Sequence, residues 1–440
     1  MREELEAVYE SARAWSRARG YAGHDPFDAL NSRLFQSTPF RRSRLARLAW
    51  TQAFKRSPVN LRPFALVPRG RNSKGTALFA LAALSRFRAT RDANHLREAR
   101  QLLDELLAAR VRSPGGFGVW GYNFDWQGRA FYAPRGTATV VPTAFAVRAL
   151  AEGVAALNPL SEEAARDASN EEGARVVEGE LSGEPQRDAA NYLEAAREAC
   201  EFILRDLNRG DEGDGEVCFS YTPLDRTRVF NASLLAGEAL AQVGALTGER
   251  ELTAHALRAA RYVVRRQRED GSWAYGADSY QTWADNFHTA FVLTSLARIL
   301  KTCGAELEGV AVKDSSVDNQ AARGDEMRRA VSRGYEFWRS SFFLADGWPK
   351  YYHRSAHPAD AHSAGAGLVA CAELVDIEPD AIDLARRVAR WSVRELFDRR
   401  GYFYYQKRRL YTVRTPFMRW SQGWMMYGLA RLLEGMKDEG

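Results

Sequence analysis

Residues 270–293 join a tight aromatic turn, Asp-Gly-Ser-Trp, to an apolar run, Asp-Asn-Phe-His-Thr-Ala-Phe-Val-Leu, whose first residue lies twelve positions after Trp273. The same offset joins Trp348 to Asp360 and Phe219 to Asn231. A fixed spacing between an aromatic turn and a polar residue that begins an apolar helix is typical of stacked helical hairpins. Such an array places all the loops of one kind on one face. We therefore expect a functional site on that face, although the fold alone does not name its reaction.

Two kinds of helical run alternate along the chain. One kind is charged and places apolar residues at three- and four-residue intervals, as expected for a helix with one face in water. These runs cover residues 96–110, 192–207, 252–267, 330–342 and 381–397. The other kind carries fewer charges and more small residues, and covers 76–87, 143–157, 232–246, 289–300, 364–374 and 421–433.

Each charged run precedes a more apolar run, about six times when the amphipathic N-terminal segment is counted. Charged helices outside and apolar helices inside describe a ring of paired helices. The pattern predicts an all-α fold, an (α/α)6-type toroid of helical hairpins with short β-hairpin-like loops on one face. We expect one domain over residues 1–440 and a further basic helix near 43–54.

The net charge of +6 hides a marked asymmetry. Residues 161–188 carry nine acids against three arginines, and residues 305–326 carry six acids against two bases. Both segments are poor in aromatic residues and are predicted to be solvated, flexible insertions. Residues 38–90 contain twelve Lys and Arg and no acid. So basic a stretch attracts an acidic glycan, a phosphate, a nucleic acid or an anionic membrane, and a soluble protein with many ion pairs explains it equally well.

Cysteine spacing and terminal composition limit the other classes. The four cysteines are far apart and form no metal-spaced pair, so we predict no metal site, no cofactor and no disulfide framework. The N-terminus is acidic and amphipathic, and no segment approaches the roughly 20 apolar residues that span a bilayer. The expectation is a cytoplasmic protein, with peripheral membrane attachment through residues 38–90 as an alternative.

Aromatic and basic residues are concentrated in the loops that lead into the apolar helices. Tryptophan and tyrosine offer flat apolar faces with polar edges, which suits stacking on sugar rings and also suits packing inside the ring. The residues that we predict to bind substrate are Trp120, Tyr122, Trp126, Arg129, Arg135, Tyr221, Trp273, Tyr275, Tyr351, His353, His357, His362, Tyr404, Arg408, Arg414, Arg419 and Trp420.

Polar residues in the same loops suggest chemistry. Removal of a proton next to a uronate carboxylate needs a neutralising Asn or Arg, a His or Tyr base and a Tyr acid. Asn286, Arg354, His288 and Tyr352 supply those types. Glycoside hydrolysis needs two carboxylates instead. The candidates for it are Asp125, Asp225, Asp285 and Asp360, although helix N-capping explains the last two equally well.

The heptapeptide Gln-Arg-Glu-Asp-Gly-Ser-Trp at 267–273 resembles the local motif of the terpenoid cyclase and prenyltransferase toroids. The Asp-x-Asp-Asp acid of triterpene cyclases is missing, as is a zinc-binding arrangement of Cys, His and Asp. The resemblance therefore implies the fold and not terpene or prenyl chemistry.

Four further segments, at 120–127, 285–289, 350–353 and 401–405, look like uncharacterised prokaryotic proteins that are commonly encoded among polysaccharide-biosynthesis genes. This resemblance implies a glycan context and assigns no functional residue. Six-hairpin toroids also serve many glycosidases, polysaccharide lyases and sugar epimerases.

Taken together, these patterns favour a protein that acts on an acidic, uronate-containing polysaccharide or glycan precursor as a lyase or epimerase. A hydrolase with paired aspartates and a non-catalytic glycan-binding or assembly protein are the alternatives. No recognised motif supports nucleic-acid binding.

Overall fold

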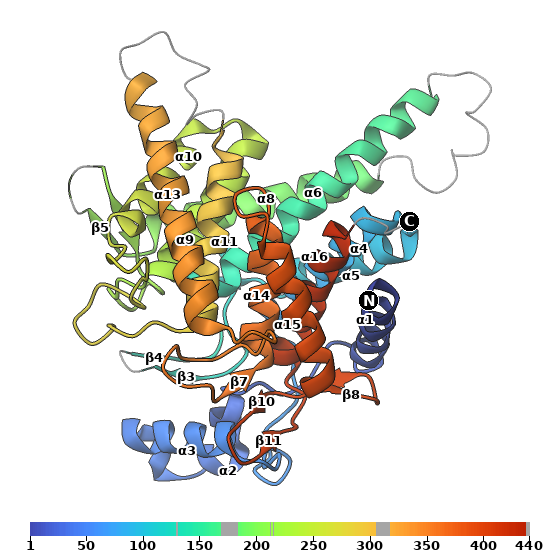
Figure 1. The fold of residues 1–440 in the computed structure, drawn as a ribbon, viewed down its shortest axis with the longest axis vertical. Helices are drawn as coiled ribbons and strands as arrows, with labels where there is room; N and C mark the ends of the chain where they lie inside the picture. Colours follow the sequence, from blue (N-terminus) through green and yellow to red (C-terminus); the bar gives the residue numbers. More distant parts are fainter. Residues whose placement is uncertain (129–130, 169–183, 212, 214, 305–316, 437–440) are drawn as a thin grey trace.

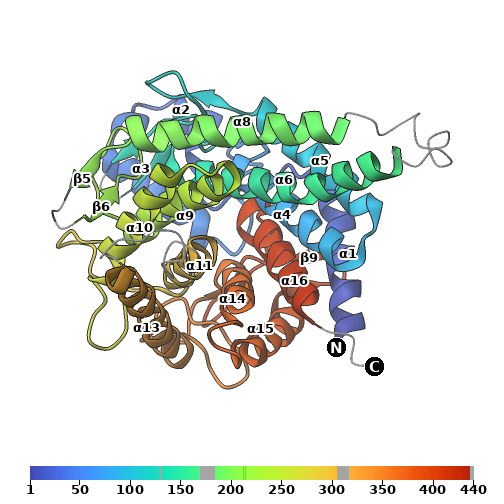
Figure 2. The ribbon, with the colours of Figure 1, turned by 90° about the horizontal axis from the view of Figure 1, so that it is seen from above.

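Six helices with few charged side chains form the inner ring of the fold. The computed structural model describes residues 1–128, 131–168, 184–211, 213, 215–304 and 317–436. The inner helices are α4 (Ser73–Thr90), α6 (Val140–Ala168), α9 (Phe230–Thr247), α11 (Asn286–Thr302), α14 (Ala361–Leu374) and α16 (Trp424–Gly435). Each packs against the next in this order, and α16 packs against α4, so that the ring is closed (Figure 2).

Six amphipathic helices surround this ring (Figure 2). They are α1 (Arg2–Arg17), α5 (Ala93–Ala108), α8 (Glu184–Arg205), α10 (Arg250–Val264), α13 (Val317–Phe342) and α15 (Ala381–Leu396). In α15 the apolar Leu384 and Trp391 are buried while Arg390 is exposed, as helical periodicity requires. Inner helix α4 buries nearly all of its side chains instead. The predicted (α/α)6-type toroid is confirmed.

Helix pairing differs from the prediction in one respect. The sequence pattern pairs each charged helix with the apolar helix that follows it. In the structure α4 packs mainly on α5, α6 on α8 and α9 on α10, so an inner helix pairs with the outer helix after it. Two-residue connections at 91–92 and 248–249 explain this, because so short a link holds its two helices side by side. The aromatic connections run the other way, from outer to inner helix.

These aromatic connections lie at one end of the toroid and contain all of the short strands described, most of which lie in the lower part of Figure 1. Antiparallel pairs form between β1 (Val111–Arg112) and β2 (Gly118–Val119), β3 (Trp126–Gln127) and β4 (Tyr132–Ala133), β5 (Arg209–Asp211) and β6 (Val217–Phe219), and β8 (Phe397–Asp398) and β9 (Tyr402–Phe403). A three-stranded sheet joins β7 (Ala359–Asp360), β10 (Gln406–Lys407) and β11 (Thr412–Val413), with Gln406 opposite both Asp360 and Val413. The expected hairpin-like loops on one face are confirmed.

Residues 18–72 cross this loop end (Figure 1). They contain η1 (Asp28–Asn31), α2 (Arg33–Gln36), η2 (Pro39–Arg42) and α3 (Arg44–Arg56), which is the basic helix expected near 43–54. A small core of Ala29, Phe54, Ala65 and Val67 holds the segment together. Buried Arg62 donates to Asp28 and to the backbone carbonyl of Asp25.

The two acidic segments are more helical than expected. Residues 161–168 continue α6, 184–188 begin α8 and 317–326 begin α13. Their composition predicts solvated insertions, but Ala, Glu and Arg are also strong helix formers, and here that preference extends the neighbouring helices. The remainder of both predicted insertions, 169–183 and 305–316, lies outside the described residues.

The apolar part of α6 departs from a second expectation. Residues 140–158 are long and apolar enough to cross a membrane by length and composition, whereas no such segment was expected. However, 83% of this stretch is buried inside the protein, as in the core helix of a soluble fold.

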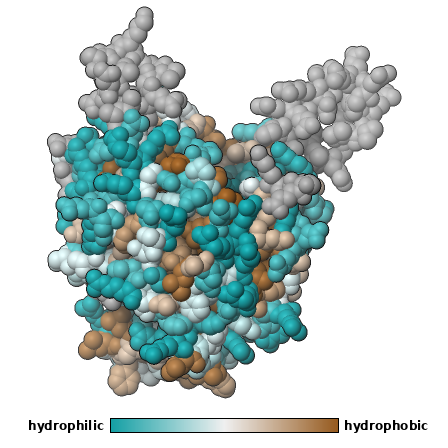
Figure 3. Space-filling model, viewed as in Figure 1, coloured by the Kyte–Doolittle hydropathy of each residue, from teal (hydrophilic) through white to brown (hydrophobic). Residues whose placement is uncertain are grey.

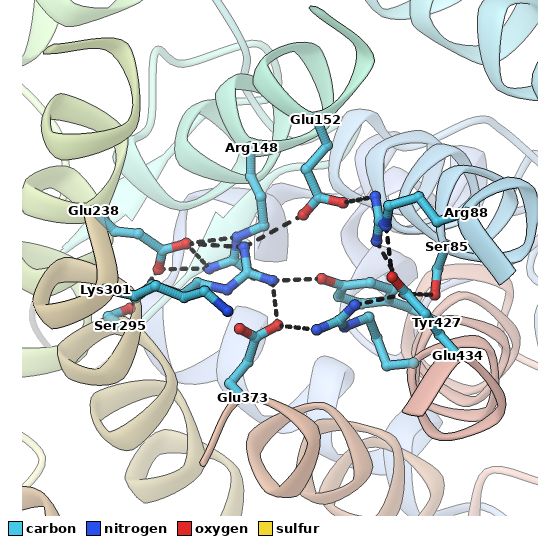
Figure 4. Close-up of polar contacts among 12 residues, drawn as sticks. Ser85, Arg88, Arg148, Glu152, Glu238, Ser295, Lys301, Glu373, Tyr427 and Glu434 are labelled. Carbon is cyan, nitrogen blue, oxygen red and sulfur yellow. Dashed lines mark hydrogen bonds and ion pairs between the residues drawn. The ribbon is translucent and has the colours of Figure 1, made fainter. Parts of the chain in front are cut away.

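A network of ion pairs joins the inner helices away from their N-termini (Figure 4). Arg148 on α6 forms a two-pronged pair with Glu238 on α9, at 2.6 and 2.7 Å. Arg298 on α11 reaches Glu238 at 3.4 Å and Glu373 on α14 at 2.7 Å. Further pairs run through Arg431 and Glu434 on α16 to Arg88 on α4 and Glu152 on α6. All six inner helices therefore contribute, so that the middle of the ring is closed by paired charges.

Candidate functional site

The N-termini of the inner helices lie at the loop end of the toroid. At this end, the start of α11 supplies an aspartate–histidine pair. Asp285 caps α11: its Oδ1 accepts from the backbone N–H of His288 at 3.1 Å, and its Oδ2 lies 2.7 Å from Nδ1 of His288. Trp283 also donates to the same carboxylate at 3.3 Å. Because a carboxylate only accepts hydrogen bonds, the Nδ1 of His288 carries a proton, and Nε2 is the ring nitrogen left to meet a ligand. The His288 side chain is 23% exposed, so it can meet a ligand.

A second imidazole lies behind the first. His362 in the first turn of α14 is 1% exposed and packs against the rings of Phe287, Trp420 and Trp424 at 4.3, 4.0 and 4.9 Å. Among the described residues, neither ring nitrogen has a hydrogen-bond partner. Burial, with help from nearby cations, holds the pKa of His362 well below its usual value, so the ring is neutral. His288 contacts the same Phe287 ring at 4.0 Å, so both imidazoles flank one side chain.

A buried lysine completes the centre. Lys74 in the first turn of α4 is 2% exposed, and its Nζ lies 4.3, 4.8 and 5.1 Å from the ring centres of Phe145, Phe291 and Trp424. Within the described part of the chain no carboxylate pairs with it. Burial first, and then the charges of Arg419 and Arg148, hold its pKa well below the usual value. Lys74 is not among the site residues predicted from the sequence, although it is the only lysine in α4.

Two cation–carboxylate groups border this centre. Arg419, on the π-helical turn η3 (Met418–Gly423) before α16, forms a two-pronged pair with Asp25 at 2.7 and 2.8 Å. Lys55 on α3 places its Nζ 4.3 Å from the ring of Phe27, and burial lowers its pKa to about 8, against the opposing effect of Asp360 and Asp25. Asp360 caps α14 and accepts from Trp420 at 3.2 Å, while burial raises its pKa.

Tyr275 and Asn231 line the side of the pair that faces α9, and Tyr351 lies near the pair in the connection between α13 and α14. Tyr275 stacks on Trp283 and meets His288 edge-on, both at 4.7 Å. Burial raises the pKa of Tyr275 and of Tyr351, so both phenols are proton donors at neutral pH. Asn231 lines the same cavity as Asp285 and His288, and among the residues described its Oδ1 is buried without a partner. The spacing repeat predicts that Asn231 begins an apolar helix, which would suit an N-cap. In the structure Asn231 lies inside α9 and does not cap it.

Three of the predicted catalytic residues are occupied elsewhere. Asp125 accepts from Tyr132, from the backbone of Arg135 and from Gln36. Asp225 accepts four bonds from Thr222 and Thr227 in its own turn. Asn286 is fully buried, donates to the carbonyl of Lys350 and accepts from Trp338. These contacts hold loops and helix ends in place. We therefore do not include the three residues in the central group, which consists of Asp285, His288, His362 and Lys74.

The other predicted site residues divide by burial. Trp120 and Trp273 are core residues, and each indole donates to a carbonyl of the preceding outer helix, Leu106 at 2.8 Å and Val263 at 2.9 Å. Tyr122 and Trp126 lie near Tyr221 of the next connection, and His353 lies near Phe337 of α13. The remaining three contact residues of their own connections: His357 lies near Trp348, Tyr404 is bonded to Asp398, and Arg408 lies beside Tyr411. Exposed residues are Arg135, Tyr352, Arg354 and Arg414, and Arg129 lies outside the described residues.

The architecture and this central group define the chain as an (α/α)6 toroid with a charged, aromatic centre at its loop end. No family model and no curated protein sequence matches the chain. The polysaccharide-gene context therefore stays a prediction.

Solved structures do share the fold. The cellobiose 2-epimerase from Bacillus thermoamylovorans B4167 is 12% identical, with a TM-score of 0.56 over 83% of this chain and 87% of that one. A D-mannose isomerase is also 12% identical, with a TM-score of 0.54 over the same shares. A glycosyl hydrolase of family 88 from Bacteroides vulgatus is 8% identical, with a TM-score of 0.54 over 98% of this chain and 99% of that one. At such identities the likeness establishes the fold alone.

Proposed function

We propose that the protein is an enzyme that removes a proton from a carbon next to a carbonyl or carboxylate group of an acidic glycan, as a lyase or an epimerase. The observation that carries this proposal is the Asp285–His288 pair, with 2.7 Å between Oδ2 and Nδ1, next to the neutral His362. That several solved toroids of this fold bear the names of sugar epimerases and isomerases agrees with it.

In the proposed step, the substrate C–H bond breaks and its proton moves to Nε2 of His288. Asp285 stabilises the imidazolium that forms, because its carboxylate already accepts a hydrogen bond from Nδ1. The electron pair moves to the substrate oxygen and gives an enolate. Negative charge near Lys74 favours uptake of a proton from solvent by its amine, and the ammonium group that results stabilises the enolate. Return of a proton to the opposite face would complete an epimerisation, whereas loss of a β-oxygen substituent would complete an elimination.

Hydrolysis has less support. It needs two carboxylates with free oxygens on either side of a glycosidic bond. Asp125 and Asp225 accept several bonds from their own loops, and Asp285 and Asp360 are buried helix caps. A glycan-binding protein without catalysis would not need the paired His288.

The test is proton NMR of uronate-containing polysaccharides incubated with the protein in heavy water. Alkene signals indicate a lyase, deuterium at the carbon next to the carboxylate indicates an epimerase, and new reducing ends indicate a hydrolase. We expect one of the first two, and we expect His288→Gln to abolish it. His255→Gln, on outer helix α10, is the matched control and should keep full activity. No change in any spectrum, with binding intact, would overturn the proposal.

A further inference from the structure

Two acid-free segments meet at the loop end of the toroid. No Asp or Glu occurs between Asp28 and Asp92, and none occurs between Asp398 and Glu434. The first segment includes α3, and the second includes the β10–β11 hairpin. They are joined where the hydroxyl of Tyr411 donates to the backbone carbonyl of Arg56 at 2.8 Å. The two stretches therefore form one continuous basic surface, which we call the basic end.

Large apolar side chains project from this surface into solvent. Leu410, at the tip of the β10–β11 hairpin, is 90% exposed and lies between Arg409 and Tyr411. Phe64 and Leu45 are both 77% exposed. Others on the same segments are Leu34, Phe40, Val59, Leu61 and Leu66. Apolar residues gather at the lower end of the space-filling view, where Figure 1 places α2 and α3 (Figure 3). Water-soluble surfaces rarely collect so many large apolar side chains without a partner.

Backbone geometry holds one of these side chains outward. Leu66 has a φ of 53°, in the left-handed region that a leucine avoids. The turn is fixed by hydrogen bonds from the N–H of Val67 to Arg62 and from Leu66 to Pro63, while Val67 is buried. The fold thus accepts backbone strain at a position that exposes an apolar side chain.

Exposed arginines alternate with these apolar residues. Arg41, Arg42, Arg44, Arg56, Arg69, Arg409 and Arg414 are exposed on the same segments. Arginine attracts anionic phosphates, and leucine and phenylalanine between the arginines can enter the acyl region beneath them. Nucleic acids and acidic polysaccharides match the charge, but they offer nothing to cover aliphatic side chains.

We propose that the basic end is a docking surface for an anionic lipid membrane. The arginines contact lipid phosphates, while Leu410 and Phe64 insert below the headgroups. Docking would turn the loop end, which includes His288, toward the bilayer. If the proposed function holds, the substrate would then be a glycan attached to a lipid; the docking itself does not depend on that function.

The test is co-sedimentation of the full chain with phosphatidylcholine vesicles, with and without phosphatidylglycerol. We expect binding only to the anionic vesicles, weakened by salt. The double variant Leu410→Glu/Phe64→Glu should reduce the partition coefficient about tenfold or more, since each apolar side chain loses its burial and gains a repelled charge. Leu246→Glu, at the opposite end of α9, should bind like wild type. Thermal unfolding would verify that all variants fold.

Absence of binding to anionic vesicles would overturn the proposal. Vesicle binding that the double variant leaves unchanged would overturn it too, because the apolar tips would then have no role. Equal binding to RNA or heparin, also unchanged in the double variant, would identify the basic end as a general polyanion surface instead. None of these readouts requires catalysis, so failure here and failure of the proposed function are distinguishable.

Discussion

Replacing Arg298 with methionine should destabilise the toroid by about 3 kcal/mol at neutral pH. Arg298 is 8% exposed, donates to Glu373 at 2.7 Å and to Tyr427 at 2.9 Å, and lies 3.4 Å from Glu238. Burial raises the pKa of Glu373, but Arg298 and then Arg431 outweigh it and lower that pKa from 4.5 to about 2. Such a difference corresponds to about 3 kcal/mol of stability, most of which depends on Arg298.

This destabilisation has a pH signature. A carboxylate whose pKa is depressed by folding stabilises the protein fully above its unfolded pKa, and that stabilisation is lost as the pH falls toward the folded pKa. The difference in the free energy of unfolding between wild type and Arg298→Met should therefore be constant above pH 4.5 and should decrease between pH 4.5 and about 2.

Thermal and denaturant unfolding across this pH range would measure this difference in stability. At neutral pH it corresponds to a decrease of about 3 °C in melting temperature for a chain of this length. Lys301→Met is the matched control, because Lys301 lies on the same helix but is 78% exposed and makes one ion pair at 3.6 Å. It should change stability by less than about 0.5 kcal/mol. Equal stability of Arg298→Met and wild type at pH 7 would refute the view that paired charges close the ring.

Three further outcomes follow from single side chains. Lys74→Met should stabilise the protein against urea unfolding at pH 7 while removing activity. Wild type folds with a depressed Lys74 pKa, so this advantage should shrink as the pH rises toward about 10, and a loss of stability at pH 7 would contradict it. His362 should stay neutral in nitrogen NMR from pH 8 down to pH 6, because burial lowers its pKa; titration near its usual value of about 6.5 would show that the ring is accessible. Gly347→Ala should lower the free energy of unfolding by about 1–3 kcal/mol, since φ is 90° and a Cβ would lie 2.4 Å from the backbone of Arg387. Gly116→Ala is the control, because Gly116 has a φ of 86° in open space, and it should destabilise the protein less. Equal melting temperatures of the two variants would disprove the close approach at Gly347.

The ring of helices could be predicted because each helix carries its own evidence. Period and charge distinguish α15 from α4 without any tertiary information. The repeat from Trp273 to Asp285 also placed the aromatic connections on one face. What the pattern could not give was which neighbour an inner helix packs on, because that depends on the lengths of the connections at both ends.

The candidate site was predictable only in part. His288 and His362 follow from their places after the aspartates that cap α11 and α14. Lys74 could not be predicted in this way, because a lysine near a helix start is usually solvated. Only the closed ring of helices shows that its Nζ faces Phe145 and Phe291. Asp225 shows the converse problem, since its four hydrogen bonds form within a turn that the sequence presents as an ordinary loop.

The central claim is that the Asp285–His288 pair takes a proton from a sugar carbon. The measurement that tests it most directly is solvent deuterium incorporation into an acidic glycan, followed by NMR, for wild type, His288→Gln and His255→Gln. The account predicts incorporation or elimination with wild type and His255→Gln and neither with His288→Gln, while glycan binding is retained by all three. Undiminished exchange or elimination with His288→Gln would contradict it.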